Sequence, residues 1–241
     1  MLSITVEAKS CDHDYGNADV CNKCGHLRVH PFESSITFLT YKENVPIWSQ
    51  PTKFSQQQEN IVKKDTPLNI NGILRNNYGN IWLRLTNNRG YVYVENVYLC
   101  LEILAMQNYQ SIWHGVTKVE KLAIFYNLVQ PNGSADYKHW LDPSNKGIMY
   151  NVKINSKFYQ MTAESFGNIH YGFLGRLAGI NDNALLYAGG AVNIATNFNK
   201  LRYNIPKLVS QCVNSYCDES SDVNDVKSGI QYFNTGVFWR R

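Results

Sequence analysis

The sequence predicts a multidomain protein in which a small all-β barrel is followed by a mainly α-helical domain. Two observations predict this order. Between residues 34 and 100, five short runs rich in β-branched and aromatic residues alternate with turn signals such as Asn71-Gly72. From Val119 to Val129, apolar residues instead recur at helical spacing. A chain of 241 residues, 44% of them hydrophobic, is long enough for both units.

The N-terminal residues favour export. Residues 1–8 are short and apolar and end in Val6-Glu7-Ala8, which is typical of the last part of a signal peptide. The basic region that normally precedes such a segment is missing, so the alternative is an ordinary N-terminal tail. No apolar run reaches the roughly 18–20 residues of a membrane span. We therefore expect a secreted or cell-wall-associated protein without a membrane span.

Residues 9–31 are polar, rich in cysteine and histidine, and unable to build a core of their own. Four N and S ligands are typical of a tetrahedral structural zinc site, which has no open position for catalysis. His26 and His30 are spare candidates for the fourth ligand, and a Cys21–Cys24 disulfide is the alternative. The candidate ligands follow the spacing C-x-H-x7-C-x2-C: Cys11, His13, Cys21 and Cys24. With this spacing the segment resembles short zinc knuckles at the edges of secreted Gram-positive proteins.

Residues 34–100 carry three landmarks in a fixed order. These are "VPIWSQP", "TPLNINGILRNNYGNIWLRL" and "RGYVYVENV". The succession resembles bacterial SH3-like cell-wall domains, which usually end in YGNxWxxL…GYVYxxNV. The resemblance implies a small barrel that binds a bacterial cell-wall polymer through exposed aromatic side chains. The alternative for each of these side chains is burial in the barrel. The candidates are Trp48, Tyr78, Trp82 and Tyr91.

A linker is expected over residues 101–118, and a mainly helical domain over 119–241. Further helices are predicted over 182–198, with Asn181 or Asp182 as N-cap, and over 222–236, with Asp222 as N-cap. The stretch 147–161 is interpreted as a loop or hairpin. Cys212 and Cys217 flank a short polar loop, and in an exported chain we expect them to form a disulfide.

The stretch "AESFGNIHYGFLG", residues 163–175, is the main candidate for chemistry. Its glycines are explained by close packing against the next helix. A helix start near Asn168 with Glu164, His170 and Tyr171 beside it is not explained by packing alone. A helix N-terminus also offers free N–H groups to developing negative charge. We expect Glu164 and His170 to share a cleft with two residues of an upstream turn, Asp136 and Lys138, and Asp225 to be a further carboxylate.

The order of four stretches in the C-terminal half resembles the polymorphic toxin type 44 family of bacterial effector domains. They are "FYNLVQPNGSADYK", "ESFGNIHYGFLGRLAGI", "LLYAGGAVNIA" and "SDVNDVKSGIQYF". Ala135 departs from the family pattern, which often has Trp there. The resemblance implies an effector or hydrolase, usually described as a nuclease toxin, and a cognate immunity protein as partner.

Three functions follow as hypotheses. The first is an exported hydrolase of peptidoglycan glycan, with Glu164 as general acid and Asp136 or Asp225 as second carboxylate. The second is a metal-independent ribonuclease toxin, with His170 as acid or base, Glu164 as its partner and Lys138 as phosphate clamp. The third is a non-enzymatic wall-binding protein. Neither reaction uses a catalytic cofactor.

Two observations bear on the choice among these hypotheses. The net charge of +4 lies wholly in residues 110–241, which hold thirteen Lys and Arg against nine Asp and Glu. This balance suits nucleic acid and an anionic cell wall equally well. The wall-binding module that the resemblance implies on the same chain favours a wall substrate, because such a module would raise the local concentration of the polymer. The first hypothesis is therefore preferred.

Overall fold

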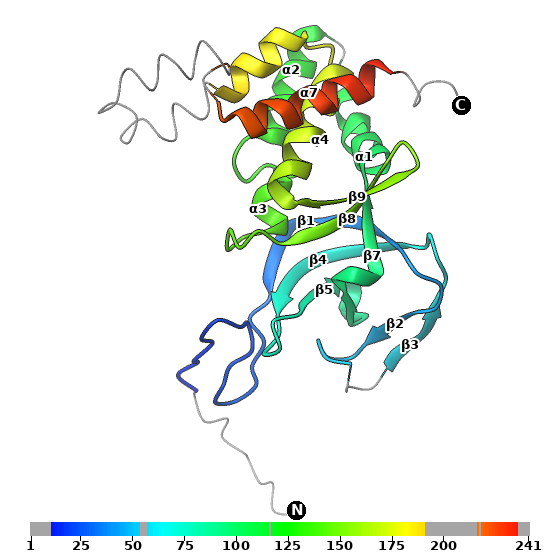
Figure 1. Cartoon of the computed structure of the whole chain (residues 1–241), viewed down its shortest axis with the longest axis vertical. Coiled ribbons are helices and arrows are strands. Elements are labelled where there is room, and N and C mark those ends of the chain that lie inside the picture. The colour runs from blue at the N-terminus through cyan, green and yellow to red at the C-terminus, as the bar shows by residue number, and fades with distance from the viewer. Residues whose placement is uncertain (1–10, 54–56, 116, 191–215, 217, 236–241) are drawn as a thin grey trace, which may run out of the picture.

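The computed structural model of the chain describes residues 11–53, 57–115, 117–190, 216 and 218–235. Figure 1 shows a β-rich part that contains the N-terminal strands, and helices α1, α2, α4 and α7 gathered together beyond β8 and β9. The predicted order, a β-rich part followed by a more helical part, is confirmed.

The five predicted β runs contain seven strands. Two of the runs are interrupted, one by a turn between Val62 and Pro67 and one by a 3-10 turn over Val94–Asn96. A second 3-10 turn covers Thr86–Asn88. The strands are β1 (His30–Thr40), β2 (Val45–Trp48), β3 (Gln57–Val62), β4 (Pro67–Arg75), β5 (Ile81–Leu85), β6 (Tyr91–Tyr93) and β7 (Val97–Cys100).

The strands form an open sheet, so the prediction of a closed barrel is wrong. Its order in the described residues is β3-β2-β6-β5-β4-β1-β7-β8-β9, which leaves β3 and β9 as edges. The reason lies at β7, which pairs antiparallel with β1 and parallel with β8 (Met149–Ile154). β8 in turn forms a hairpin with β9 (Lys157–Thr162), so the stretch left open as loop or hairpin is a hairpin. The sheet therefore continues into the C-terminal half instead of closing on itself.

Where a linker was expected, the chain forms helix α1 (Leu101–Trp113). The helix follows β7 directly and buries Leu101, Leu104, Ala105 and Ile112. The Gln107 side-chain amide also donates a hydrogen bond to the Thr37 hydroxyl of β1, at 2.9 Å. These buried residues belong to one hydrophobic core that runs from the sheet into the C-terminal helices. Residues 101–113 are therefore a packed element rather than an extended connection.

The remaining helices agree with the sequence in type and differ at their starts. α2 (Lys118–Val129) confirms the helix predicted from 119, and Thr117 and Glu120 form its capping box. α3 (Tyr137–Leu141) is short. α4 (Ala163–Leu177) begins five residues before the expected Asn168, because the Thr162 hydroxyl accepts from the Ser165 N–H at 3.1 Å.

Two predicted helix caps are resolved by the structure. Residues 182–190 are helical. The side-chain oxygen of Asn181 accepts a hydrogen bond from the Ala184 N–H at 2.8 Å, so Asn181 is the N-cap. The last helix, α7 (Ser220–Asn234), has Glu219 at its N-cap position. The prediction of Asp222 as its cap is therefore wrong, and Asp222 lies within the first turn.

Candidate functional site

Helices α4 and α7 are in very close contact because glycines lie where they cross. A Cβ atom on Gly172 would overlap the Val226 carbonyl, and one on Gly229 would overlap the Ile169 carbonyl. The contacts advance in the same sense along both helices, since Ser165 meets Asp225 and Phe173 meets Phe233. The N-terminal turns of α4 and α7 therefore lie side by side.

The other glycines of α4 have separate roles. A Cβ atom on Gly175 would overlap Leu185, so Gly175 allows the helix over 182–190 to approach, as the sequence predicts. Gly179 has a φ of +81° just after the end of α4, a backbone conformation that favours glycine. It ends the helix and contributes nothing to the contact with α7.

The adjacent helix starts bring carboxylates together. Glu164 is exposed in the first turn of α4, and Asp222 and Asp225 are half-buried in the first two turns of α7. The negative charge of Glu164 acts on Asp222, and the ammonium of Lys138 in α3 acts on it with the opposite sign. We call Glu164, Asp222, Asp225 and Lys138 the helix-start cluster.

Burial raises the pKa of two carboxyl groups in this cluster, Asp222 and Asp225. Burial, and then the charges of Glu164, Asp218 and Glu219, raise the pKa of Asp222 to about 6, although Lys138 lowers it. Burial also raises the pKa of Asp225, while a hydrogen bond from the Ser165 hydroxyl opposes the shift. Asp222 thus keeps its proton to a pH closer to neutral than an ordinary aspartic acid does, which is the property a general acid needs.

Asn168 and Tyr171, two further candidates from the sequence, lie on α4 one and two turns beyond Glu164. The Asn168 side-chain NH2 is buried and has no hydrogen-bond partner among the residues that the structure describes. The Tyr171 hydroxyl donates to the Leu185 carbonyl at 3.1 Å, and its ring packs against Phe125. Tyr171 therefore joins α4 to the helix over 182–190, whereas the unpaired Asn168 NH2 is enclosed by the protein one turn beyond Glu164.

His170 does not face the cluster. It is fully buried between α4 and α1, its ring 4.8 Å from that of Tyr137, and its Nε2 lies 3.3 Å from the Asn108 amide. Its Nδ1 makes no well-formed hydrogen bond among the described residues, although the nearby Leu104 carbonyl favours protonation. Burial outweighs this effect and lowers the pKa of His170 to about 3. The expected cleft shared by Glu164 and His170 is therefore wrong.

Asp136 is also held elsewhere. Its carboxylate accepts from the Asn132 N–H at 3.0 Å and stabilises the turn before α3. It makes no side-chain capping bond to α3, for which it is the N-cap residue. Of the two upstream candidates, the structure thus brings Lys138 to the helix-start cluster and leaves Asp136 in the turn.

The aromatic candidates of the sheet divide by exposure. Tyr78 is 73% exposed at the tip of the β4–β5 turn, whereas Trp82 is 4% exposed and packs against Tyr93. Trp48 and Tyr91 are half-buried partners across β2 and β6. Trp82 therefore belongs to the core, and Tyr78 is the candidate most open to a ligand.

The four predicted metal ligands of the N-terminal segment do converge. The ligand atoms of Cys11, His13, Cys21 and Cys24 all lie within 4.8 Å of one another. The Cys11 and Cys21 sulfurs are 3.8 Å apart, and the Cys24 sulfur is 3.3 Å from His13 Nδ1. Bond lengths to zinc imply ligand separations of about 3.5–3.8 Å in a tetrahedron. These four residues could therefore bind a metal ion.

The spare histidines are used differently. His26 Nδ1 lies 2.7 Å from the Tyr15 hydroxyl and the ring stacks on His13, so it orients a ligand. His30 Nε2 lies 2.9 Å from the Asp19 carboxylate. Burial raises the pKa of Cys21, but hydrogen bonds from His13 and from backbone N–H groups lower it to about 5, which favours the thiolate that metals bind. Cys212 and Cys217, the predicted disulfide, lie outside the described residues.

Sequence reasoning missed one member of the cluster. Asp222 was assigned to capping alone, although Asp222 and Asp225 are spaced i, i+3 and therefore share a helix face. That spacing was the available signal. Their proximity to Glu164, which is more than fifty residues away, comes only from the contact between α4 and α7.

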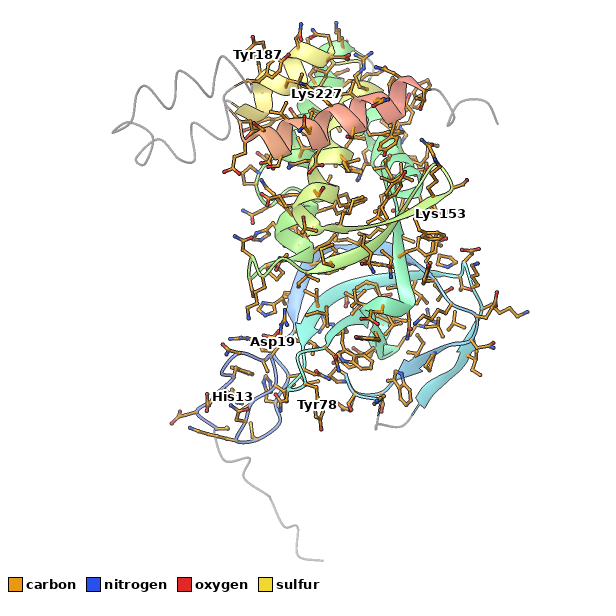
Figure 2. The ribbon with its side chains drawn as sticks, in the orientation of Figure 1. His13, Asp19, Tyr78, Lys153, Tyr187 and Lys227 are labelled. Carbon is orange, nitrogen blue, oxygen red and sulfur yellow. The ribbon has the colours of Figure 1, made fainter. Side chains whose placement is uncertain are left out.

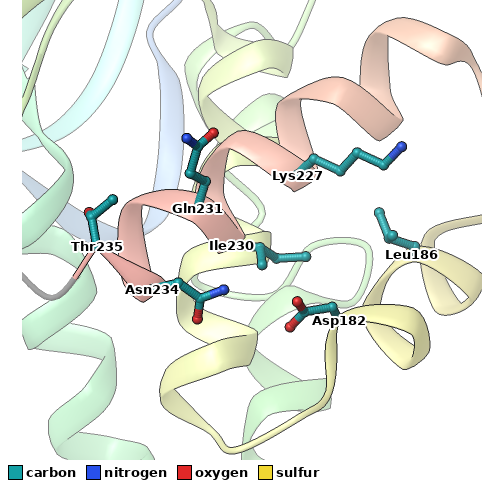
Figure 3. A pocket seen from close by; sticks show the side chains of 7 residues that line it. All are labelled: Asp182, Leu186, Lys227, Ile230, Gln231, Asn234 and Thr235. Atoms are coloured by element: carbon teal, nitrogen blue, oxygen red, sulfur yellow. The ribbon is translucent and has the colours of Figure 1, made fainter.

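A pocket of about 420 Å³ lies between α7 and the helix over 182–190 (Figure 3). Figure 3 shows Asp182 and Leu186 facing Lys227, Ile230 and Asn234 across it. None of the cluster residues lines this pocket. It is therefore a separate hollow along the later turns of α7.

The comparisons with known proteins concern the C-terminal half. Residues 124–235 match the family model described as Bacterial toxin 44. The match begins within α2 and ends just after α7, so it includes the whole helix-start cluster. This part of the chain is thus similar to a bacterial toxin domain. No curated protein and no solved structure matches the chain. No described helix is both long and apolar enough to cross a membrane.

Proposed function

We propose that this chain is a secreted, cell-wall-associated bacterial toxin that hydrolyses the glycan of peptidoglycan. The observation that carries the proposal is the pair of unlike carboxyl groups at the starts of α4 and α7. Hydrolysis of a glycosidic bond uses one protonated and one ionised carboxyl group. The pKa of Asp222 is raised to about 6 beside the Glu164 carboxylate, which supports these two roles.

The roles differ from those expected from the sequence. Asp222 gives its proton to the oxygen of the leaving sugar as the glycosidic bond breaks. The second role falls to Glu164, which either takes a proton from the attacking water or attacks the sugar carbon itself. Lys138 lowers the pKa of Asp222 by its positive charge. Asp225 is bonded to Ser165 and positions the first turn of α4.

A ribonuclease toxin is the second candidate, and the burial of His170 argues against the version predicted here. A histidine with a pKa of about 3 and no exposed atom cannot exchange protons with RNA at neutral pH. A toxin of either kind implies an immunity protein as partner in the producing cell. Binding of the wall by the N-terminal sheet remains part of the proposal and is supported by the exposure of Tyr78.

The test uses the full chain incubated in parallel with peptidoglycan sacculi and with total RNA. We expect soluble glycan fragments from the sacculi and intact RNA. Asp222→Asn and Glu164→Gln should each lower the rate about 10²–10⁴-fold. The control is Glu33→Gln, an exposed acid of β1, which should keep the rate.

The pH profile separates the roles. The rate should fall as the pH rises above about 6, because Asp222 then loses the proton it must donate. Lys138→Met should move this limb to higher pH, since it removes the charge that lowers the pKa of Asp222. Cleaved RNA with intact sacculi would favour the ribonuclease, and two intact polymers would favour a non-enzymatic protein.

A further inference from the structure

A polar groove lies between the N-terminal metal-ligand segment and the end of the sheet, away from α7. Its volume is about 660 Å³. Tyr15, Asn17 and Asn22 line one wall, and Arg75, Asn77 and Lys146 the other. Figure 2 marks the region with Asp19 and Tyr78, far from Lys227 on α7. We call it the knuckle groove; its lining contains two cations and no carboxylate.

Asp19 fixes the first wall. It is 8% exposed and lies inside the segment that carries the metal ligands. Its carboxylate accepts from the Arg75 N–H at 2.8 Å and from the Arg28 guanidinium at 3.0 Å. The Asp19 N–H donates to the Arg75 carbonyl at 2.7 Å. The segment is therefore held directly against the last residue of β4.

Two other side chains fix the second wall. The Asn76 side-chain oxygen accepts from the N–H groups of Tyr78 and Asn80, at 3.1 and 3.0 Å, and its NH2 donates to the Pro51 carbonyl. The Asp142 carboxylate accepts from the N–H groups of Lys146, Gly147 and Ile148, at 2.6–3.1 Å. The turn that carries Asn77 and the loop that carries Lys146 are thus both held in place before any ligand binds.

The groups that face the groove are free. The side chains of Asn17, Asn22, Asn77 and Lys146 make no hydrogen bond within the described residues. The Arg75 guanidinium gives one bond, to the Gly79 carbonyl at 3.2 Å, and keeps its other donors. A rigid frame with unused side-chain donors and acceptors is typical of a binding site rather than of a structural turn.

The chemistry of these groups defines the ligand. Amide side chains both donate to and accept from hydroxyl and N-acetyl groups, and Arg and Lys bind carboxylates. We infer that the knuckle groove binds an N-acetylated, carboxylate-bearing saccharide, the chemistry of a peptidoglycan glycan strand with free lactyl groups. The choice of this polymer rests on the proposed function, whereas the groove itself does not. A second contact of this kind would keep the polymer bound to the chain that carries the helix-start cluster.

The test measures equilibrium binding by fluorescence anisotropy, with the full chain carrying Glu164→Gln so that the strands stay intact. The probes are labelled peptide-free glycan strands, the same strands with amidated carboxylates, and an RNA oligonucleotide of similar length. Lys146→Gln and Asn77→Ala should each weaken binding to the glycan about five- to tenfold. Amidation should weaken it similarly, and the Lys146→Gln variant should no longer respond to amidation.

The matched control is Lys23→Gln. Lys23 is an exposed cation of the N-terminal metal-ligand segment and does not line the groove, so this variant should change binding less than about twofold. Asn77 and Lys146 are exposed, so thermal unfolding should be unchanged in both groove variants. Equal binding by the groove variants and the parent overturns the inference, and so does tighter binding of RNA with the same sensitivity. Bound but uncleaved strands with the unmodified chain refute the proposed hydrolysis and leave the groove standing.

Discussion

At the scale of single residues, burial decides which polar side chains carry chemistry. The sequence predicted His170 as a catalytic acid or base and Asp222 as a helix cap. The structure buries His170 completely and lowers its pKa to about 3, whereas partial burial beside Glu164 raises the pKa of Asp222 to about 6. His170 is a neutral member of the core, near Asn108 and Tyr137, and Asp222 is the proton donor of the proposed function.

The neutral state of His170 predicts a pH dependence of stability. In the unfolded chain the imidazole titrates near 6.5, and in the folded protein near 3, so between these values the unfolded state binds more protons. Stability should therefore fall as the pH falls below about 6.5. Between pH 6 and 4 the loss from this residue is about 2–3 kcal/mol.

Urea unfolding of the parent and of His170→Gln at pH 7, 6, 5 and 4 measures this loss. The variant is neutral throughout, so its free energy of unfolding should approach that of the parent as the pH falls. Other groups titrate equally in both proteins and cancel in the difference. Two curves that stay parallel across this range would show that His170 is not held neutral.

At the scale of elements, the contact between α4 and α7 creates the candidate site. The sequence explained the glycines of α4 by packing against the next helix; the structure supports this for Gly175, whereas Gly172 packs against α7 instead. Gly229, on the other helix, makes the contact equally close from the opposite side. Without these glycines the first turns of the two helices, and hence Glu164 and Asp222, would separate.

A substitution at the crossing therefore should act on stability and on the site together. Gly229→Ala places a methyl group against the Ile169 carbonyl, and should lower the free energy of unfolding by about 1–3 kcal/mol. The control is Gly167→Ala in α4, where the nearest atom to the new Cβ is 3.4 Å away. There the helix gains from alanine, by up to about 1 kcal/mol. A Gly229→Ala variant as stable as Gly167→Ala would mean that the helices are not in close contact.

At the scale of the whole molecule, the sheet joins the two halves of the chain. β7 pairs with β8 across a sequence separation of about fifty residues, and α1 buries four side chains in the common core. A closed barrel followed by a linker would have made the halves independent. The open sheet instead makes the position of the C-terminal helices depend on the N-terminal strands.

Limited proteolysis tests this dependence. We expect no early cleavage within residues 101–113, because α1 would have to leave the core before a protease could bind it. Mass spectrometry of the first fragments gives the sites directly. As a reference, the exposed Tyr78 turn offers an accessible site in the same digestion. Rapid cleavage inside α1, giving two stable fragments, would restore the division into two separate domains.

Features that depend on short spacings could be predicted from the amino-acid sequence. The Cys and His pattern of the N-terminal segment, the alternation of the strands and the capping box of α2 all act over a few residues, and the structure contains them. The toxin-like character of the C-terminal half also follows from local stretches, and the family match over residues 124–235 supports it.

Features that depend on distant segments could not be predicted without the fold. The sheet is open because β7 pairs with β8. The alternation of residues along a strand predicts which side chains are buried, but it does not predict which distant strand pairs with it. The burial of His170, the approach of Asp222 to Glu164 and the knuckle groove likewise arise where separate elements meet. Burial and charge are properties of the surroundings of a side chain, and packing alone supplies those surroundings.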